Sequence, residues 1–210
     1  MARELENESV EASTPSKPKM TYEEFLEWAD GTHAEWVDGE VIQMSPASDR
    51  HQDLVDFLTA LFRFFTETKR LGIIRSAPFQ MKTGKKLGGR EPDIIFLSNA
   101  NLDRLKPNHL DGPADLVVEI ISPESRARDR GDKFYEYEQG GVSEYWLIDY
   151  LRKQAEFYQL GEDGIYRAMS AGEDGLYRSQ AIEGLWIEVE WLWQEPLPLL
   201  LTVLKEWRLI

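Results

Sequence analysis

Two short apolar runs, Pro92-Asp93-Ile94-Ile95-Phe96 and Leu116-Val117-Val118-Glu119-Ile120-Ile121-Ser122-Pro123, each carry one acidic residue. Runs of this length and composition are typical of buried β-strands, and the second indicates a central strand that is covered on both faces. An ionised carboxylate in such a place costs free energy unless a cation or hydrogen bonds compensate it. Asp93 and Glu119 are therefore candidate site residues; the alternative is two structural acids paired with arginines such as Arg90 or Arg126.

A lysine follows these two runs. Residues 126–139 predict a helix that contains Lys133 and ends at Gly140-Gly141, a favoured C-cap sequence. If Asp93 lies on a strand beside Glu119 and faces the same way, the two carboxylates converge. Together with a backbone carbonyl and waters they would form a Mg²⁺ or Mn²⁺ site. Lys133 would then orient a water activated by the ion and stabilise the charge of the transition state.

Two further candidates lie upstream. Residues 33–45 predict a hairpin that turns at Asp38-Gly39, and in it Glu40 points either into the site or toward solvent. Residues 49–65 predict a largely buried helix, with Asp49 as its N-cap and His51 in its first turn. A histidine in that position is either a polar surface group or a functional residue.

The other segments predict the rest of an α/β domain. The capping-box spacing of Thr21 and Glu24 predicts a short helix from residue 21 to about residue 30. Residues 73–82 predict one strand, in which Pro78 marks an edge or a bulge. The expected later elements are a hairpin tip at 83–90, a hairpin at 144–160, turns of a peripheral β meander at the near-duplicates 161–167 and 172–178, and a short C-terminal helix.

The composition excludes several classes of protein. The 210 residues are 42% hydrophobic and 11% aromatic, enough for a substantial core, so the chain is not globally disordered. Without cysteine it has no disulfide, thiolate metal site or cysteine nucleophile. No apolar run reaches the length of a membrane span, and the N-terminus lacks the apolar segment of a secretory signal. We expect a cytoplasmic protein with no membrane partner, a disordered tail at 1–19 and a single domain at 20–210.

The charge is unevenly distributed. The net charge of −14 argues against a general nucleic-acid coat, because Lys and Arg drive phosphate binding. Residues 49–133 carry 15 basic and 13 acidic groups, whereas residues 1–48 carry 3 and 11 and residues 134–210 carry 6 and 14. The stretch around the two carboxylates is the only one that is not strongly acidic, which is compatible with a local basic rim.

An ordered set of residues resembles a known family. Pro-Asp on one strand, Glu on the next and a lysine beyond look like the PD-(D/E)XK restriction-endonuclease-like superfamily. Within it the chain is similar to the Uma-type bacterial family, long catalogued as a domain of unknown function. The resemblance covers roughly residues 20–200 and rests on these residues: Glu35, Asp38-Gly39-Glu40, Pro46, His51, Pro92-Asp93, Glu119-Ile120-Ile121-Ser122-Pro123, Lys133, Tyr137 and residues 141–149.

This resemblance implies a fold and an activity. The fold would be a restriction-endonuclease-like mixed central β-sheet flanked by helices, and the activity Mg²⁺- or Mn²⁺-dependent hydrolysis of phosphodiester bonds, with DNA as the substrate. Asp93 and Glu119 would bind the metal and Lys133, His51 and Glu40 would assist. The superfamily's usual lysine position, two residues after the glutamate, is Ile121 here, and Lys133 takes that role in the Uma-type pattern. Tyr137 would form a hydrogen bond at the site or only pack there.

Other functions remain open. A non-catalytic binding or regulatory module that retains the nuclease fold is the main alternative, and the acidic flanking segments favour it. A second alternative is a hydrolase that uses a carboxylate pair without metal, such as a glycosidase, which would leave Lys133 without a role. A homodimer is a further arrangement that we keep open.

Overall fold

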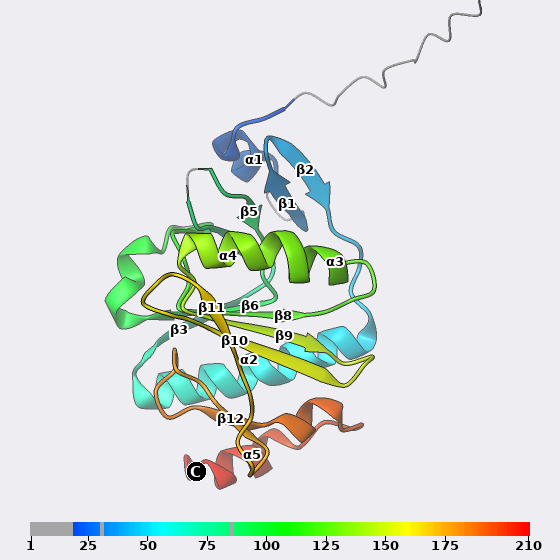
Figure 1. Ribbon diagram of the computed structural model, residues 1–210, viewed down its shortest axis with the longest axis vertical. Coiled ribbons are helices and arrows are strands. Elements are labelled where there is room, and N and C mark those ends of the chain that lie inside the picture. The colour runs from blue at the N-terminus through cyan, green and yellow to red at the C-terminus, as the bar shows by residue number, and fades with distance from the viewer. Residues whose placement is uncertain (1–18, 30–31, 85) are drawn as a thin grey trace, which may run out of the picture.

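A six-stranded mixed sheet forms the centre of the computed structural model, which describes residues 19–29, 32–84 and 86–210 (Figure 1). The strand order is β11-β10-β9-β8-β6-β3, with β8 and β9 parallel and all other neighbours antiparallel. This arrangement confirms the predicted α/β class. The strands are β3 (Gly72–Ser76), β6 (Ile94–Ser98), β8 (Leu116–Ile120), β9 (Glu144–Asp149), β10 (Gln154–Leu160) and β11 (Tyr166–Met169).

Helices cover both faces of this sheet (Figure 1). The long helix α2 (Asp49–Lys69) packs on one face, and α3 (Arg126–Arg128) and α4 (Phe134–Gly140) lie on the other, joined by a π-helical turn, Asp129–Lys133. Strand β8 is buried throughout, as its sequence predicts. Alternation sends Leu116, Val118 and Ile120 into the core with α2, so Glu119 points to the opposite face, toward α4.

A smaller sheet lies beyond α3 and α4 (Figure 1). Its strand order is β2-β1-β5-β4-β7, and helix α1 (Tyr22–Trp28) packs beside it through a small cluster with Tyr22 and Phe25. The helical segment 126–140 therefore lies between two sheets. The strands are β1 (Ala34–Val37), β2 (Glu40–Gln43), β4 (Gln80–Lys82), β5 (Gly89–Arg90) and β7 (His109–Asp111).

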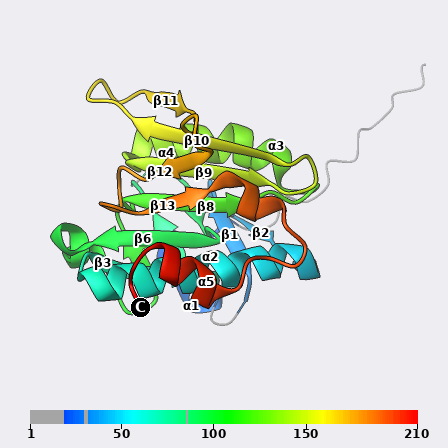
Figure 2. The same ribbon diagram turned by 90° about the horizontal axis from the view of Figure 1, so that it is seen from below.

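The C-terminal segment covers the outer side of α2 (Figure 2). Strand β11 extends the central sheet, whereas β12 (Leu176–Arg178) and β13 (Trp186–Glu188) form a separate two-stranded ribbon, so the expected meander is divided between two sheets. Helix α5 (Leu200–Glu206) follows. Two 3₁₀ helices, Asn99–Arg104 and Val189–Trp193, complete the fold. Among the described residues, no helix combines the length and the apolar composition that a membrane crossing needs.

Local sequence signals were mostly correct. The Thr21–Glu24 capping box is present, and the hairpin turns at Asp38-Gly39, where both residues have positive φ, 50° and 89°. Two details differ from the prediction. The N-cap of α2 is Ser48, whose hydroxyl accepts from the backbone of His51, and the expected strand at 73–82 is split into β3 and β4, which join different sheets. Of the tail expected at residues 1–19, all but residue 19 lies outside the described residues.

Candidate active site

Four of the five predicted site residues line one cleft. The cleft has a volume of about 800 Å³ and opens where the N-terminal end of α2, the start of β6 and the ends of β8 and β9 meet. His51, Asp93, Glu119 and Lys133 all line it. They come from α2, from the residue before β6, from β8 and from the π-helical turn, so the fold brings together side chains that are far apart in the sequence.

The register of β6 and β8 brings the two carboxylates together. Ile94 pairs with Val118 in antiparallel register, and continuing this register by one residue sets Asp93 opposite Glu119. Directly opposed residues of an antiparallel pair point to the same face of the sheet. Asp93 Oδ2 is fixed by a hydrogen bond of 2.7 Å from the backbone N–H of Ile120. The convergence expected from alternation is present.

Lys133 reaches Glu119 from the helix that follows β8. Its ammonium lies 2.8 Å from Glu119 Oε1, 2.9 Å from Glu35 Oε1 and 3.4 Å from Asp129 Oδ1. Both Asp129 and Lys133 belong to the π-helical turn and are almost fully buried. Ile121, at the usual superfamily position of the lysine, is instead fully buried in the core between the sheet and α4.

Two further residues contact the predicted site residues: Tyr137, for which the sequence left open a hydrogen bond at the site or packing alone, and Glu35, to which the sequence assigned no role. The Tyr137 hydroxyl, one turn after Lys133, donates to Glu119 Oε1 at 2.9 Å. Glu35 is fully buried, and its second oxygen accepts from Arg90 at 2.9 Å and lies 3.5 Å from Arg128 Nε. The sequence did contain a signal for Glu35: like Asp93, it is an acidic residue next to apolar residues in a predicted strand.

Glu40 is not brought to the site. It is exposed at the start of β2 and does not line the cleft. The hairpin register pairs Glu35 with Ile42 and Val37 with Glu40, so Glu35 and Glu40 share a face but lie at different distances from the turn. Glu40 adjoins the turn at Asp38-Gly39, while Glu35 lies deeper in the fold and contacts Lys133. The structure therefore brings Glu35, and not Glu40, to Lys133.

His51 faces Asp93 across the cleft. Its Nε2 lies 3.3 Å from Asp93 Oδ2, and the side chain is 13% exposed. Burial lowers the pKa of His51, but the hydrogen bond and the charge of Asp93 outweigh burial and hold that pKa above its usual value. The imidazole therefore favours its charged form beside the carboxylate.

The buried charged groups around Lys133 shift one another's pKa values. Burial raises the pKa of Glu119; Lys133 opposes this shift and the nearby acids Asp129 and Asp93 add to it. Burial disfavours the charged form of Lys133, but Glu119, Glu35 and Asp129 outweigh it and hold its pKa well above the usual range. Burial likewise acts to raise the pKa of Glu35, yet Lys133 and Arg90 lower it to about 2. The raised pKa of Lys133 favours its ammonium form.

Neither candidate carboxylate is paired with the arginines considered as structural partners. Arg90 binds Glu35 and forms two hydrogen bonds, of 2.6 and 2.7 Å, with Glu136. Arg126 binds Asp149 at 3.1 and 3.3 Å. The acids of the cleft are compensated by Lys133, His51, Tyr137 and one backbone N–H instead.

The donor set of the cleft fits a hard divalent cation. Asp93 and Glu119 form a two-carboxylate set in the cleft. Over residues 19–29, 32–84 and 86–210, no three His, Asp or Glu side chains are grouped to hold a metal. Glu119 accepts its hydrogen bonds at Oε1 and Asp93 accepts its hydrogen bond at Oδ2. The other oxygen of each takes no hydrogen bond from a described residue. Mg²⁺ is commonly held by one or two carboxylates, with water in its remaining positions.

Comparisons with known proteins agree with the fold and with the family resemblance. An uncharacterized protein of Synechocystis sp., slr1290, is 27% identical over 158 residues, which cover 73% of this chain and 82% of that protein. A crystal structure described as "a putative nuclease belonging to DUF820" from Anabaena variabilis has a TM-score of 0.62 and 16% identity, covering 76% of this chain and 89% of that one; at this identity the likeness shows a shared fold. The Uma2 family, described as "Putative restriction endonuclease", matches residues 22–190. Because this match spans most of the sequence, the chain belongs to the Uma2 family.

Proposed function

We propose that the protein is a divalent-metal-dependent endonuclease that hydrolyses phosphodiester bonds of DNA. One observation carries the proposal: Asp93 and Glu119 lie side by side in a cleft, and the Lys133 ammonium is 2.8 Å from Glu119. Paired carboxylates with a nearby cation are suited to a reaction in which a metal ion and a positive charge stabilise a phosphate. Membership of the Uma2 family supports the same class of activity.

The residues of the cleft would have different roles in the reaction. Asp93 and Glu119 would hold Mg²⁺ or Mn²⁺ through their free oxygens, and the bound ion would lower the pKa of a coordinated water and neutralise charge on a phosphate oxygen. Lys133 and Tyr137 fix Oε1 of Glu119, so Oε2 is the oxygen left for the ion. Of the three carboxylate contacts of Lys133, the one with Asp129 Oδ1 is the longest, at 3.4 Å. The ammonium proton that faces Asp129 would therefore be the one that Lys133 donates to a water or a phosphate.

A binding subunit that retains the fold without cleaving DNA is a second candidate. The net charge of −14 favours it, because few cations are available for phosphate contacts. The enclosure of Lys133 by three carboxylates also favours it, since a fully paired ammonium has little left to offer a substrate. Such a module would bind DNA or a partner but would show no metal-dependent turnover.

Plasmid nicking in the presence of Mn²⁺ tests the proposal. We expect the wild-type protein to nick supercoiled DNA, and Glu119→Gln and Lys133→Met to lower the rate by on the order of 10²-fold, the loss typical of removing one charge-stabilising group. The exposed acid Glu67 on α2 provides the control, because Glu67→Gln should nick at the wild-type rate. Circular dichroism of each variant confirms folding. Nicking that survives in both site variants would refute the site, and its absence in the wild type would favour the binding module.

A further inference from the structure

The turn between β9 and β10, residues 150–153, borders the candidate active-site cleft through its first two residues. Tyr150 and Leu151 line the cleft together with Asp93 and Glu119. Leu151 is 57% exposed, and Arg152 and Lys153 beside it are also exposed. An exposed apolar side chain of the cleft lining is therefore followed directly along the chain by two exposed cations, and none of these three side chains takes part in the chemistry described above.

This turn is held in place by its neighbours. The Tyr150 hydroxyl lies 2.9 Å from Ser48 Oγ, at the N-terminal end of α2. The backbone N–H of Arg152 lies 3.2 Å from the carbonyl oxygen of Asp149 and 3.2 Å from its Oδ1. Asp149 is itself buried and bound by Arg126. Because these contacts hold the backbone of the turn, it would lose less conformational entropy on binding a ligand than a loose loop would.

The cations of this turn differ from nearby cations that already have acidic partners. Arg128, which lines the cleft, lies 3.5 Å from Glu35 Oε2, and Arg130 binds Glu156 at 2.6 Å and lies 3.5 Å from Asp149. By contrast, the side chains of Arg152 and Lys153 make no ion pair or hydrogen bond with any residue that the structure describes. In a chain with a net charge of −14, two neighbouring free cations at the cleft edge would attract an anionic partner.

We propose that the 150–153 turn docks the DNA strand that enters the cleft. Arg152 and Lys153 bind phosphates next to the one that reaches Asp93 and Glu119, and Leu151 packs against a sugar or a base. Phosphate contacts of this kind position a nucleic acid, and apolar side chains at such edges pack against exposed bases. This inference rests on the proposed function, because it takes DNA as the ligand of the same cleft.

Binding of fluorescein-labelled 20-mer DNA, single-stranded and duplex, tests this inference. Fluorescence anisotropy is measured in Ca²⁺, a hard cation that takes the same oxygen ligands, over a series of salt concentrations. We expect the double variant Arg152→Ala/Lys153→Ala to weaken binding on the order of tenfold. The plot of the logarithm of the association constant against the logarithm of the salt concentration has a negative slope. The magnitude of this slope should decrease by about 1.4–1.8, the value expected for the loss of two phosphate contacts. Leu151→Ser should weaken binding without changing that slope.

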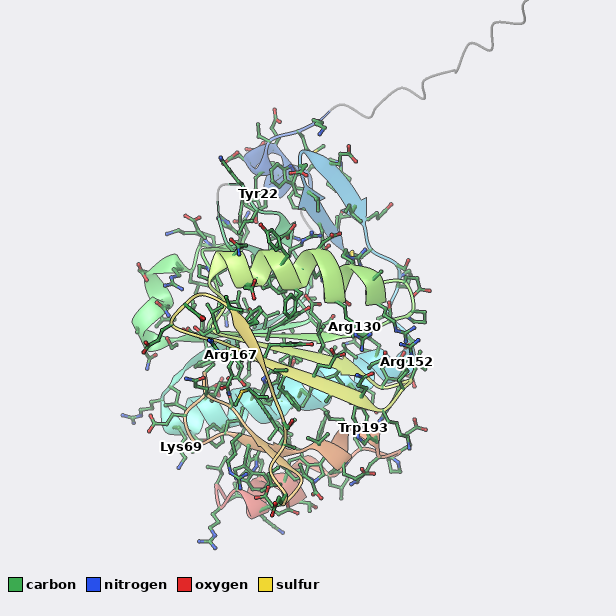
Figure 3. All side chains as sticks on the ribbon, in the orientation of Figure 1. Tyr22, Lys69, Arg130, Arg152, Arg167 and Trp193 are labelled. Carbon is green, nitrogen blue, oxygen red and sulfur yellow. The ribbon has the colours of Figure 1, made fainter. Side chains whose placement is uncertain are left out.

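A charge-matched control uses exposed lysines elsewhere. Figure 3 shows Lys69 at the opposite end of α2 from Arg152, and Lys205 lies in α5, so Lys69→Ala/Lys205→Ala removes the same charge away from the cleft. This control should bind like the wild type. Three results would overturn the inference: the turn variant binds DNA as tightly as the wild type, the control variant is weakened as much as the turn variant, or the wild type does not bind DNA. Turn-dependent binding without plasmid nicking would remove only the nuclease proposal, and nicking with turn-independent binding would remove only this one.

Discussion

Lys133 lies among three buried carboxylates. Glu35 comes from the small sheet, Glu119 from the central sheet and Asp129 from the same helical turn as Lys133. Removing one member of a buried charge group leaves the others uncompensated, which typically costs about 3–5 kcal/mol. The cluster therefore couples the position of the ammonium to the packing of both sheets.

Glu35 makes this coupling measurable through pH. Its carboxyl pKa is lowered from the ordinary 4.5 to about 2, so its contribution to stability is present above pH 4.5 and is lost as the pH falls toward 2. At pH 3 about 2 kcal/mol of that contribution should be gone. We predict that the difference in unfolding free energy between wild type and Glu35→Gln, measured in urea, is smaller at pH 3 than at pH 7 by this amount.

The exposed Glu67 supplies the control for this measurement. Glu67→Gln should follow the wild-type pH dependence, because its side chain forms no ion pair with a described residue. A Glu35→Gln difference that is the same at both pH values would show that Glu35 is not held ionised by Lys133 and Arg90 in the folded protein.

The sequence predicted the positions of some of these residues and not of others. Asp93, Glu119 and Lys133 could be grouped because two buried strands and the following helix fix their order and faces. Glu35 could not be separated from Glu40 by alternation, since both lie on one face of the hairpin. Which of the two meets Lys133 depends on how the small sheet is placed on α3 and α4. That placement is a tertiary property that local patterns do not contain.

At the scale of elements, the π-helical turn Asp129–Lys133 distinguishes the helical segment 126–140. Single π turns within helices occur frequently at functional sites. Here the turn holds Asp129 and Lys133 on the buried side, and the Tyr145 hydroxyl donates to the carbonyl of Asp129 at 3.0 Å. The sequence predicted one helix over this range; hydrophobic periodicity does not show a local change in turn width.

Two glycines, Gly131 in the π-helical turn and Gly141 at the C-terminal end of the segment, test its backbone geometry. A Cβ at Gly131 or at Gly141 would meet no atom within 4 Å, but Gly141 has a φ of +84° and Gly131 has no positive φ. Gly131→Ala should therefore stabilise the protein by about 0.4–1 kcal/mol, and Gly141→Ala should destabilise it by about 1–2 kcal/mol. Thermal unfolding of the two variants checks the opposite signs, and a shift of both in the same direction would contradict the assigned cap.

At the scale of the whole molecule, the central sheet is shared by two cores. One core joins α2, the sheet and the C-terminal segment, and the other joins the sheet to α4 and the small sheet. Ion pairs from Glu35 to Lys133 and from Arg90 to Glu136 connect the small sheet to the helical layer. We propose that residues 20–210 form one domain because no layer buries its apolar face alone.

A single cooperative transition is the expected consequence. Far-ultraviolet and near-ultraviolet circular dichroism should report the same midpoint in urea, as two-state unfolding requires. Two separated transitions would show that the small sheet unfolds independently and would refute the single domain.

The layered arrangement was predictable in class but not in detail. Alternating strand and helix patterns indicated an α/β domain with a buried β8. The division of residues 73–82 between two sheets was not visible, because each half has an acceptable strand pattern and only the packing separates them. The cleft likewise depends on where four distant elements end.

An anomalous difference map from crystals soaked in Mn²⁺ tests whether Asp93 and Glu119 bind a metal ion. We predict one strong peak in the cleft, within bonding distance of the free carboxylate oxygens of both residues, about 2.1 Å for an octahedral ion of this size. The peak should be absent from crystals of Asp93→Asn. A map without a peak in the cleft, or with a peak that persists in the variant, would show that the two carboxylates do not form a metal site.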